Sequence, residues 1–130
     1  MKGIDTNILL RYLLRDDEEQ YQKALSLFKG IGNDQFFVNL VVVTEVWWVL
    51  DYIYNYKKEE LISTFEILLQ SKEIVFQEAE SIFKALNTYK KSNADFEDCL
   101  INQLNENIHA AVTYTFDKKA SRLKGMNLLE

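Results

Sequence analysis

Residues 1–14 read MKGIDTNILLRYLL, and they predict a very short strand over residues 1–5 that passes directly into a helix. The helix is indicated by Leu9, Leu10, Leu13 and Leu14, which recur at helical spacing. A strand followed at once by a helix is the unit from which parallel sheets are built. This opening therefore favours an α/β fold in which Asp5 stands at the end of the first strand.

The rest of the chain repeats the same alternation. Further strands are predicted at residues 35–38, 73–76 and 111–116, with a fifth edge strand at 126–129. Helices are predicted from the acidic run at 16–19 to the glycines at 30 and 32, and then at 40–54, 57–69, 78–89, 95–107 and 117–123. We expect an α/β fold with a central parallel sheet of four or five strands and helices on both faces, a three-layer arrangement. By length, residues 1–130 form a single domain.

Composition limits the class of protein. A hydrophobic fraction of 48% supports a real core, and the single cysteine, Cys99, rules out an intramolecular disulfide framework. No signal peptide is expected, and the longest apolar stretch, residues 36–50, is interrupted by polar side chains. We expect a soluble, cytoplasmic protein without a membrane segment. The net charge of −5 counts against a binder that works through phosphate contacts alone, but acids gathered around metal ions remain compatible with RNA.

Glu45 lies in the most apolar stretch of the chain, among valines and tryptophans. A buried, unpaired carboxylate there would be costly, so Glu45 is expected to need a cation or a hydrogen-bond donor. The alternatives are an ion pair with a basic side chain, or an exposed position on a narrow polar strip beside Thr44 and Asp51.

Three further acids stand near element ends. Asp95 and Asp98 share one helical face, and Ser92 or Asn93 could cap that helix. Capping suits Asp95, whereas Asp98 is expected to lie too far into the helix for it. Asp117 directly follows the fourth strand, and capping of the last short helix is an equal alternative for it.

The four acids Asp5, Glu45, Asp98 and Asp117 come from separate elements, and active sites of parallel sheets gather beyond the carboxyl ends of the strands. At about 5 Å, two carboxylates repel by roughly 3 kcal/mol at an effective dielectric of about 20. A hard cation with oxygen ligands relieves this repulsion, which predicts Mg²⁺ or Mn²⁺ held by all four acids. With one histidine and one cysteine, a zinc site is nearly excluded. His109 suits an ordinary helix end, and Cys99 suits packing.

Three stretches of the chain resemble PIN-domain ribonucleases of the VapC toxin type. They are Ile4–Leu13 (IDTNILLRYL), Asp95–Ile101 (DFEDCLI) and Thr113–Lys119 (TYTFDKK), in family order, and Glu45 falls in the helix where the family carries its glutamate. The resemblance implies the PIN fold and metal-dependent hydrolysis of RNA, with Asp5, Glu45, Asp98 and Asp117 as the acidic quartet.

The same resemblance implies supporting residues and partners. Asp95 supports the third acid, while Thr6, Asn7 and Thr115 match positions that steady the carboxylates or bind phosphate. Family members usually form homodimers and are neutralised by a small antitoxin. Basic side chains could grip RNA phosphates as a set, although each alone suits a solvated surface: Arg11, Arg15, Lys57, Lys58, Lys118, Lys119, Arg122 and Lys124. Aromatic side chains either pack the core or face a second copy or an antitoxin helix: Trp47, Trp48, Tyr52, Tyr54 and Tyr56.

Two alternatives from other classes stay open at this point. A Mg²⁺-dependent phospho-receiver domain would carry paired acids at the end of the first strand, but Asp5 has no acidic neighbour and Asn7 stands where a second aspartate would be needed. A degenerate PIN-like module would bind RNA or protein without cleavage, which the full set of acids disfavours.

Overall fold

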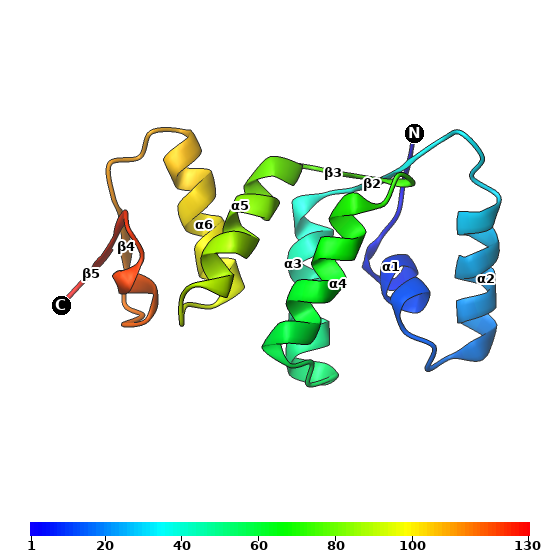
Figure 1. Cartoon of the computed structure of the whole chain (residues 1–130), viewed down its shortest axis with the longest axis horizontal. Coiled ribbons are helices and arrows are strands. Elements are labelled where there is room, and N and C mark those ends of the chain that lie inside the picture. The colour runs from blue at the N-terminus through cyan, green and yellow to red at the C-terminus, as the bar shows by residue number, and fades with distance from the viewer. The chain divides into compact units, whose positions relative to one another are not determined.

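The computed structural model describes all residues from 1 to 130, and they form two compact units, Met1–Gln77 and Glu78–Glu130. We call these the amino-terminal unit and the carboxyl-terminal unit. The elements, labelled in Figure 1, are β1 (Lys2–Gly3), α1 (Thr6–Leu13), α2 (Glu18–Lys29), β2 (Phe36–Val38), α3 (Leu40–Trp48), the π-helix η1 (Val49–Ile53), α4 (Lys58–Gln70), β3 (Ile74–Phe76), α5 (Ala79–Lys90), α6 (Phe96–Asn107), β4 (Thr113–Thr115), the 3₁₀ turn η2 (Ala120–Arg122) and β5 (Met126–Leu128). The predicted alternation of strands and helices is confirmed.

The amino-terminal unit is built on a parallel sheet in the order β1-β2-β3. In the central strand, Phe36 and Val38 are buried while Phe37 between them is half-buried, as the two-residue period of a strand requires. The ladder continues past β1, because the Ile4 amide donates to the Phe37 carbonyl at 3.2 Å. Asp5 is therefore held at the end of a strand that is anchored in the sheet.

Aromatic side chains fill the core of this unit. Tyr12 stacks on Phe28 with ring centroids 3.8 Å apart, and Phe28 packs on Phe36 at 4.7 Å, which joins α1 and α2 to the sheet. Helices α3 and α4 lie side by side (Figure 1), with the rings of Trp47 and Phe65 4.9 Å apart between them. Helix α1 packs against both α2 and α3. The start of α1, where Asp5 stands, and the second half of α3, which carries Glu45, thus rest on a packed core.

The carboxyl-terminal unit pairs the helices α5 and α6, followed by the parallel strands β4 and β5 (Figure 1). Ile82, Leu86, Phe96 and Cys99 are buried in this unit, so the expected packing role of Cys99 is confirmed. The Asn102 side-chain amide donates to the Lys124 carbonyl at 2.8 Å, which ties α6 to the turn before β5.

Several predicted elements differ from the structure. The expected single sheet of four or five strands is wrong as stated, since three strands pair in one unit and β4 pairs with β5 in the other. The helix predicted for residues 40–54 is an α-helix only to Trp48, and the Tyr54 amide then bonds five residues back to Val49. The helix predicted for residues 117–123 shrinks to one 3₁₀ turn. None of the helices combines the length and apolar character that a membrane crossing requires.

Candidate metal centre

Asp5 begins α1 and caps it. Its backbone is extended, and its side-chain oxygen accepts a hydrogen bond from the Ile8 amide at 3.0 Å. This is the usual contact of an N-cap residue, and it satisfies one of the free amides at the helix start. Asp5 is exposed, and a carboxylate that accepts one amide keeps lone pairs for a further ligand.

Glu45 is exposed, and its predicted burial is wrong. Helix α3 buries Val42, Val43, Val46 and Trp47, and this face turns Glu45 outwards. The valine-rich sequence predicts burial on most sides, because composition alone does not show which face of α3 packs against the core. The side chain is nevertheless held in place, since the Thr6 hydroxyl donates to Glu45 Oε1 at 3.3 Å.

That contact joins the start of α1 to α3. Thr6 directly follows Asp5 in the chain, so its hydroxyl places the Glu45 carboxylate beside the first turn of α1. The structure thus supports the expected role of Thr6 in steadying a carboxylate. Asn7 is exposed in the same turn.

The carboxyl-terminal unit gathers three acids. Carboxylate oxygens of Asp95, Asp98 and Asp117 all lie within 4.8 Å of one another, with Asp98 half-buried and the other two exposed. Asp95 is the N-cap residue of α6, and Asp98 lies in the first turn of that helix. The expectation that Asp98 lies too deep in the helix for a terminal position is therefore wrong. Asp95 itself occupies the cap, which moves the helix start two or three residues later than Ser92 or Asn93 would place it.

Asp117 is fixed by two hydrogen bonds in the turn after β4. Its amide donates to the Thr115 hydroxyl at 3.0 Å, and its carboxylate accepts from the Ala120 amide at 3.0 Å. Capping and membership of the acidic cluster, which the sequence left as alternatives, therefore occur together. Thr115 thus holds the backbone of Asp117 in this turn.

The cluster is electrostatically strained. Burial, followed by the nearby charges of Asp117 and Asp95, raises the pKa of Asp98 above its usual value. At a separation of 4.8 Å, two carboxylates repel by between about 1 kcal/mol in water and about 3.5 kcal/mol at an effective dielectric of 20. A protein gains no stability from such an arrangement. A cation bound between the carboxylates would turn the net electrostatic energy of the cluster from repulsive to attractive.

The donor set fits Mg²⁺ or Mn²⁺. All three side chains offer oxygen, which hard divalent cations prefer. An octahedral ion with bonds of about 2.1 Å spans at most about 4.2 Å between opposite ligands. Adjacent ligands of such an ion lie only about 3.0 Å apart, so the carboxylates would close around the ion, or one of them would reach it through water.

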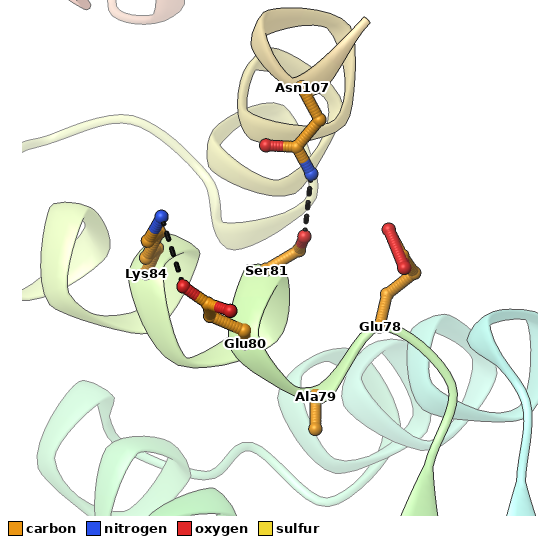
Figure 2. A pocket seen from close by; sticks show the side chains of 6 residues that line it. All are labelled: Glu78, Ala79, Glu80, Ser81, Lys84 and Asn107. Atoms are coloured by element: carbon orange, nitrogen blue, oxygen red, sulfur yellow. Dashed lines mark hydrogen bonds and ion pairs between the residues drawn. The ribbon is translucent and has the colours of Figure 1, made fainter.

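The carboxyl-terminal unit also has a pocket that none of these three acids lines. Figure 2 shows it at the start of α5, where Asn107 donates to the buried Ser81 hydroxyl at 2.8 Å and Lys84 pairs with Glu80 at 3.3 Å. Because these polar groups satisfy one another, the pocket presents no free ligand set. We do not place the functional site there.

A second pocket adjoins Asp5 in the amino-terminal unit, between α1 and α2. Gln20 and Lys23 of α2 line it, and the sequence analysis did not single out either residue. Their signal was the helical spacing they share with Ala24 and Leu27, which places all four on one face of α2.

The other candidate residues have ordinary environments. Arg11 pairs with Asp16, and Arg15 pairs with Glu18 at 2.8 Å, so both arginines are engaged within the chain. Trp47 is buried, whereas Trp48 and Tyr52 are 48% and 59% exposed with ring centroids 5.6 Å apart. His109 follows the end of α6, as expected.

Comparison with known proteins brings these parts together. The family model described as the PIN domain matches residues 3–126, a range that includes Asp5, Glu45, Asp95, Asp98 and Asp117. A VapC ribonuclease of Aquifex aeolicus (strain VF5) is 30% identical over 105 residues, which cover 77% of this chain and 75% of that relative. These matches confirm the resemblance carried by the three sequence motifs, and the chain belongs to the PIN domain family.

Proposed function

We propose that the chain is a metal-dependent endoribonuclease that hydrolyses RNA phosphodiester bonds and acts as the toxin of a type II toxin–antitoxin pair. The observation that carries this proposal is the cluster of Asp95, Asp98 and Asp117, whose mutual repulsion calls for a bound cation. Membership of the PIN domain family and the similarity to a protein named VapC ribonuclease support the same activity. The family match counts against a phospho-receiver domain.

We assign Asp5, Glu45, Asp98 and Asp117 as ligands of Mg²⁺ or Mn²⁺, with Asp95 in support, and treat residues 1–130 as one PIN domain. The match of the family model to residues 3–126 supports the single PIN domain. When bound, the dication supplies an activated water and stabilises charge on the leaving 3′-oxygen.

The chain's own residues would orient this chemistry. Thr6 holds the Glu45 carboxylate, and Thr115 fixes the backbone of Asp117. Asp5 accepts from the Ile8 amide and keeps lone pairs for a metal ion. Pre-set carboxylates reduce the reorganisation needed on metal binding, which is how a site gains affinity from rigid supports.

Partners follow from the resemblance. We propose a small antitoxin and a homodimer as the chain's protein contacts. The exposed pair of Trp48 and Tyr52 supplies aromatic surface of the kind that interfaces favour.

A cleavage assay tests the proposal. Labelled total RNA is incubated with the protein in Mg²⁺, in Mn²⁺ and in chelator, and wild type is compared with Asp5→Asn and Asp98→Asn. We expect cleavage by wild type with either metal, none in chelator, and losses of at least a hundredfold in both variants. Glu59→Gln, which neutralises an exposed acid in the first turn of α4, serves as the matched control and should cleave normally.

The results separate the alternatives. Equal cleavage by wild type and Asp98→Asn would remove the catalytic assignment. RNA binding that chelator leaves unchanged, without cleavage in either metal, would instead identify a non-cleaving binding module.

A further inference from the structure

The pocket beside Asp5 has a volume of about 320 Å³ and lies within the amino-terminal unit. It falls at the lower end of the range for sites that bind small organic groups, about 300–1,000 Å³. One wall comes from the first turns of α1, including Asn7 and Ile8, and the other from α2, including Gln20, Lys23 and Leu27. Asp5 stands at its edge, so whatever fills the pocket lies next to a proposed metal ligand.

The two walls present an apolar surface with a polar rim. Leu27 is 41% exposed, and it lines the pocket together with the half-buried Ile8 and the buried Ala24. Gln20 adds a side-chain amide that both donates and accepts hydrogen bonds. An apolar surface beside an amide suits a nucleobase, whose face packs on apolar groups and whose edge carries donors and acceptors.

The two basic side chains that line this pocket, Arg11 and Lys23, differ in how firmly each is paired with an acid. Arg11 is held by Asp16, whose second oxygen accepts from the Tyr54 hydroxyl, so its charge is already compensated. Lys23 pairs with Glu19 at 3.3 Å, and the two side chains are 75% and 81% exposed. Such an exposed pair is weak and exchanges readily for a phosphate group. Lys23 is therefore the cation that can meet a nucleotide here.

We propose that this pocket binds the nucleotide adjacent to the cleaved bond of a single-stranded RNA. Its base packs against Leu27 and Ile8, the edge of the base meets Gln20, and its phosphate meets Lys23. This inference rests on the proposed function, because Asp5, which lines the pocket, is one of the acids proposed as metal ligands. The substrate is single-stranded at this position, since a paired base is stacked within its helix and cannot enter a pocket.

The test uses short single-stranded RNAs that differ at one base, with the full-length protein. KM and kcat are measured for wild type, Lys23→Ala, Gln20→Ala and Leu27→Ala, and equilibrium binding is measured by fluorescence anisotropy in chelator. Lys29→Ala on the same helix and Ile67→Ala on α4 are matched controls, because both residues are exposed and neither lines the pocket. Thermal melts verify that all variants fold.

We expect Lys23→Ala to raise KM for every RNA and to lower the slope of log Kd against log salt by about 0.7, the effect of one lost phosphate contact on a single strand. Gln20→Ala should weaken binding about tenfold for the preferred base and leave other bases nearly unchanged. Leu27→Ala should raise KM with little change in kcat or in the salt slope. Both control variants should match wild type.

The failure of this inference is distinct from the failure of the proposed function. Normal cleavage with unchanged KM and Kd in all three pocket variants overturns the pocket and leaves the nuclease intact. Absence of cleavage by wild type, with Kd still dependent on Lys23 and Leu27, removes the nuclease and supports the pocket. Pocket variants that cleave normally but are no longer neutralised by the antitoxin would show that the pocket binds a protein. That result would overturn the proposal that it binds a nucleotide.

Discussion

Replacing Asp98 with asparagine tests the acidic cluster through stability, independently of any nuclease assay. The substitution removes one charge from a group of three carboxylates within 4.8 Å of one another while keeping the shape of the side chain. In the absence of metal, the wild-type protein carries all three pairwise repulsions, whereas the variant keeps only the one between Asp95 and Asp117. We therefore expect Asp98→Asn to be more stable than wild type in chelator and less stable than wild type in Mg²⁺.

The magnitude follows from the separations. Because Asp95 and Asp117 are exposed, the solvent-screened figure of about 1 kcal/mol applies to each pair, and the variant gains about 2 kcal/mol. Loss of an acid from the first turn of α6 offsets about 0.3–1 kcal/mol of this gain. The net gain is about 1–1.5 kcal/mol, which for 130 residues corresponds to a rise in Tm of about 4–6 °C.

Thermal melts in chelator and in Mg²⁺ provide the assay. At a concentration about a hundred times its Kd, the metal stabilises wild type by about 2.7 kcal/mol and should raise its Tm by about 10 °C. Asp98→Asn should respond weakly to Mg²⁺. Glu59→Gln, the control, loses a first-turn acid outside the cluster and should fall slightly in Tm under both conditions.

The pH dependence has a defined sign. Because the pKa of Asp98 is raised above its ordinary value of 3.8, the ionised side chain destabilises the metal-free fold above the raised pKa, and protonation relieves this as the pH falls. The advantage of Asp98→Asn in chelator should thus be full at pH 7 and absent below about pH 3.8. A variant less stable than wild type in chelator at pH 7, or a Tm that Mg²⁺ raises equally in both proteins, would refute the reasoning.

Two further predictions concern the scaffold. Gly125 has φ +98° and an added Cβ would lie 3.1 Å from Asn102 Oδ1, so Gly125→Ala should lower the free energy of unfolding in urea by more than about 1 kcal/mol, whereas Gly3→Ala, with open space around it, should change it little. The Arg15 guanidinium lowers the pKa of Glu18 to about 2, and the stability from this pair is present above about pH 4.5 and lost as the pH falls towards 2. Glu18→Gln should therefore lower Tm slightly at pH 7 and not at pH 2, and an equal loss at both values would contradict the ion pair.

The sequence predicted the order of the elements well because each carried a local signal. Leucine spacing marked α1, the acidic run marked the start of α2, and strands of three residues at Phe36, Ile74 and Thr113 were all found near their predicted positions. Strand pairing was not predictable in the same way. It depends on contacts between residues distant in the chain, and strands of two or three residues carry too little alternation to specify their neighbours.

The site shows the same division. Asp95, Asp98 and Asp117 were identified as acids near element ends, and the structure brings them together. The predicted burial of Glu45 is wrong, because only one face of α3 is buried and Glu45 lies on the exposed side together with Val41 and Trp48. Packing decides which face of a helix is buried. When apolar residues occur on nearly every side of a helix, its sequence does not indicate which face that will be.

The positions of the acids explain how the fold tolerates them without metal. Asp5 is the N-cap of α1, Asp95 is the N-cap of α6, and Asp117 accepts from the Ala120 amide at the start of η2. Backbone amides at helix starts are unpaired donors with partial positive charge, so the carboxylates of Asp5 and Asp117, which each accept from one, are partly stabilised before any cation binds. The Asp95 side chain makes no capping hydrogen bond. Capping and metal binding are thus compatible roles of one side chain, because a carboxylate that gives one oxygen to an amide keeps lone pairs for an ion. Asp98 is not a cap residue, and it is half-buried. Burial and the charges of Asp117 and Asp95 therefore raise its pKa. We therefore expect the ionisation of Asp98 to respond to a bound cation more strongly than that of Asp95 or Asp117.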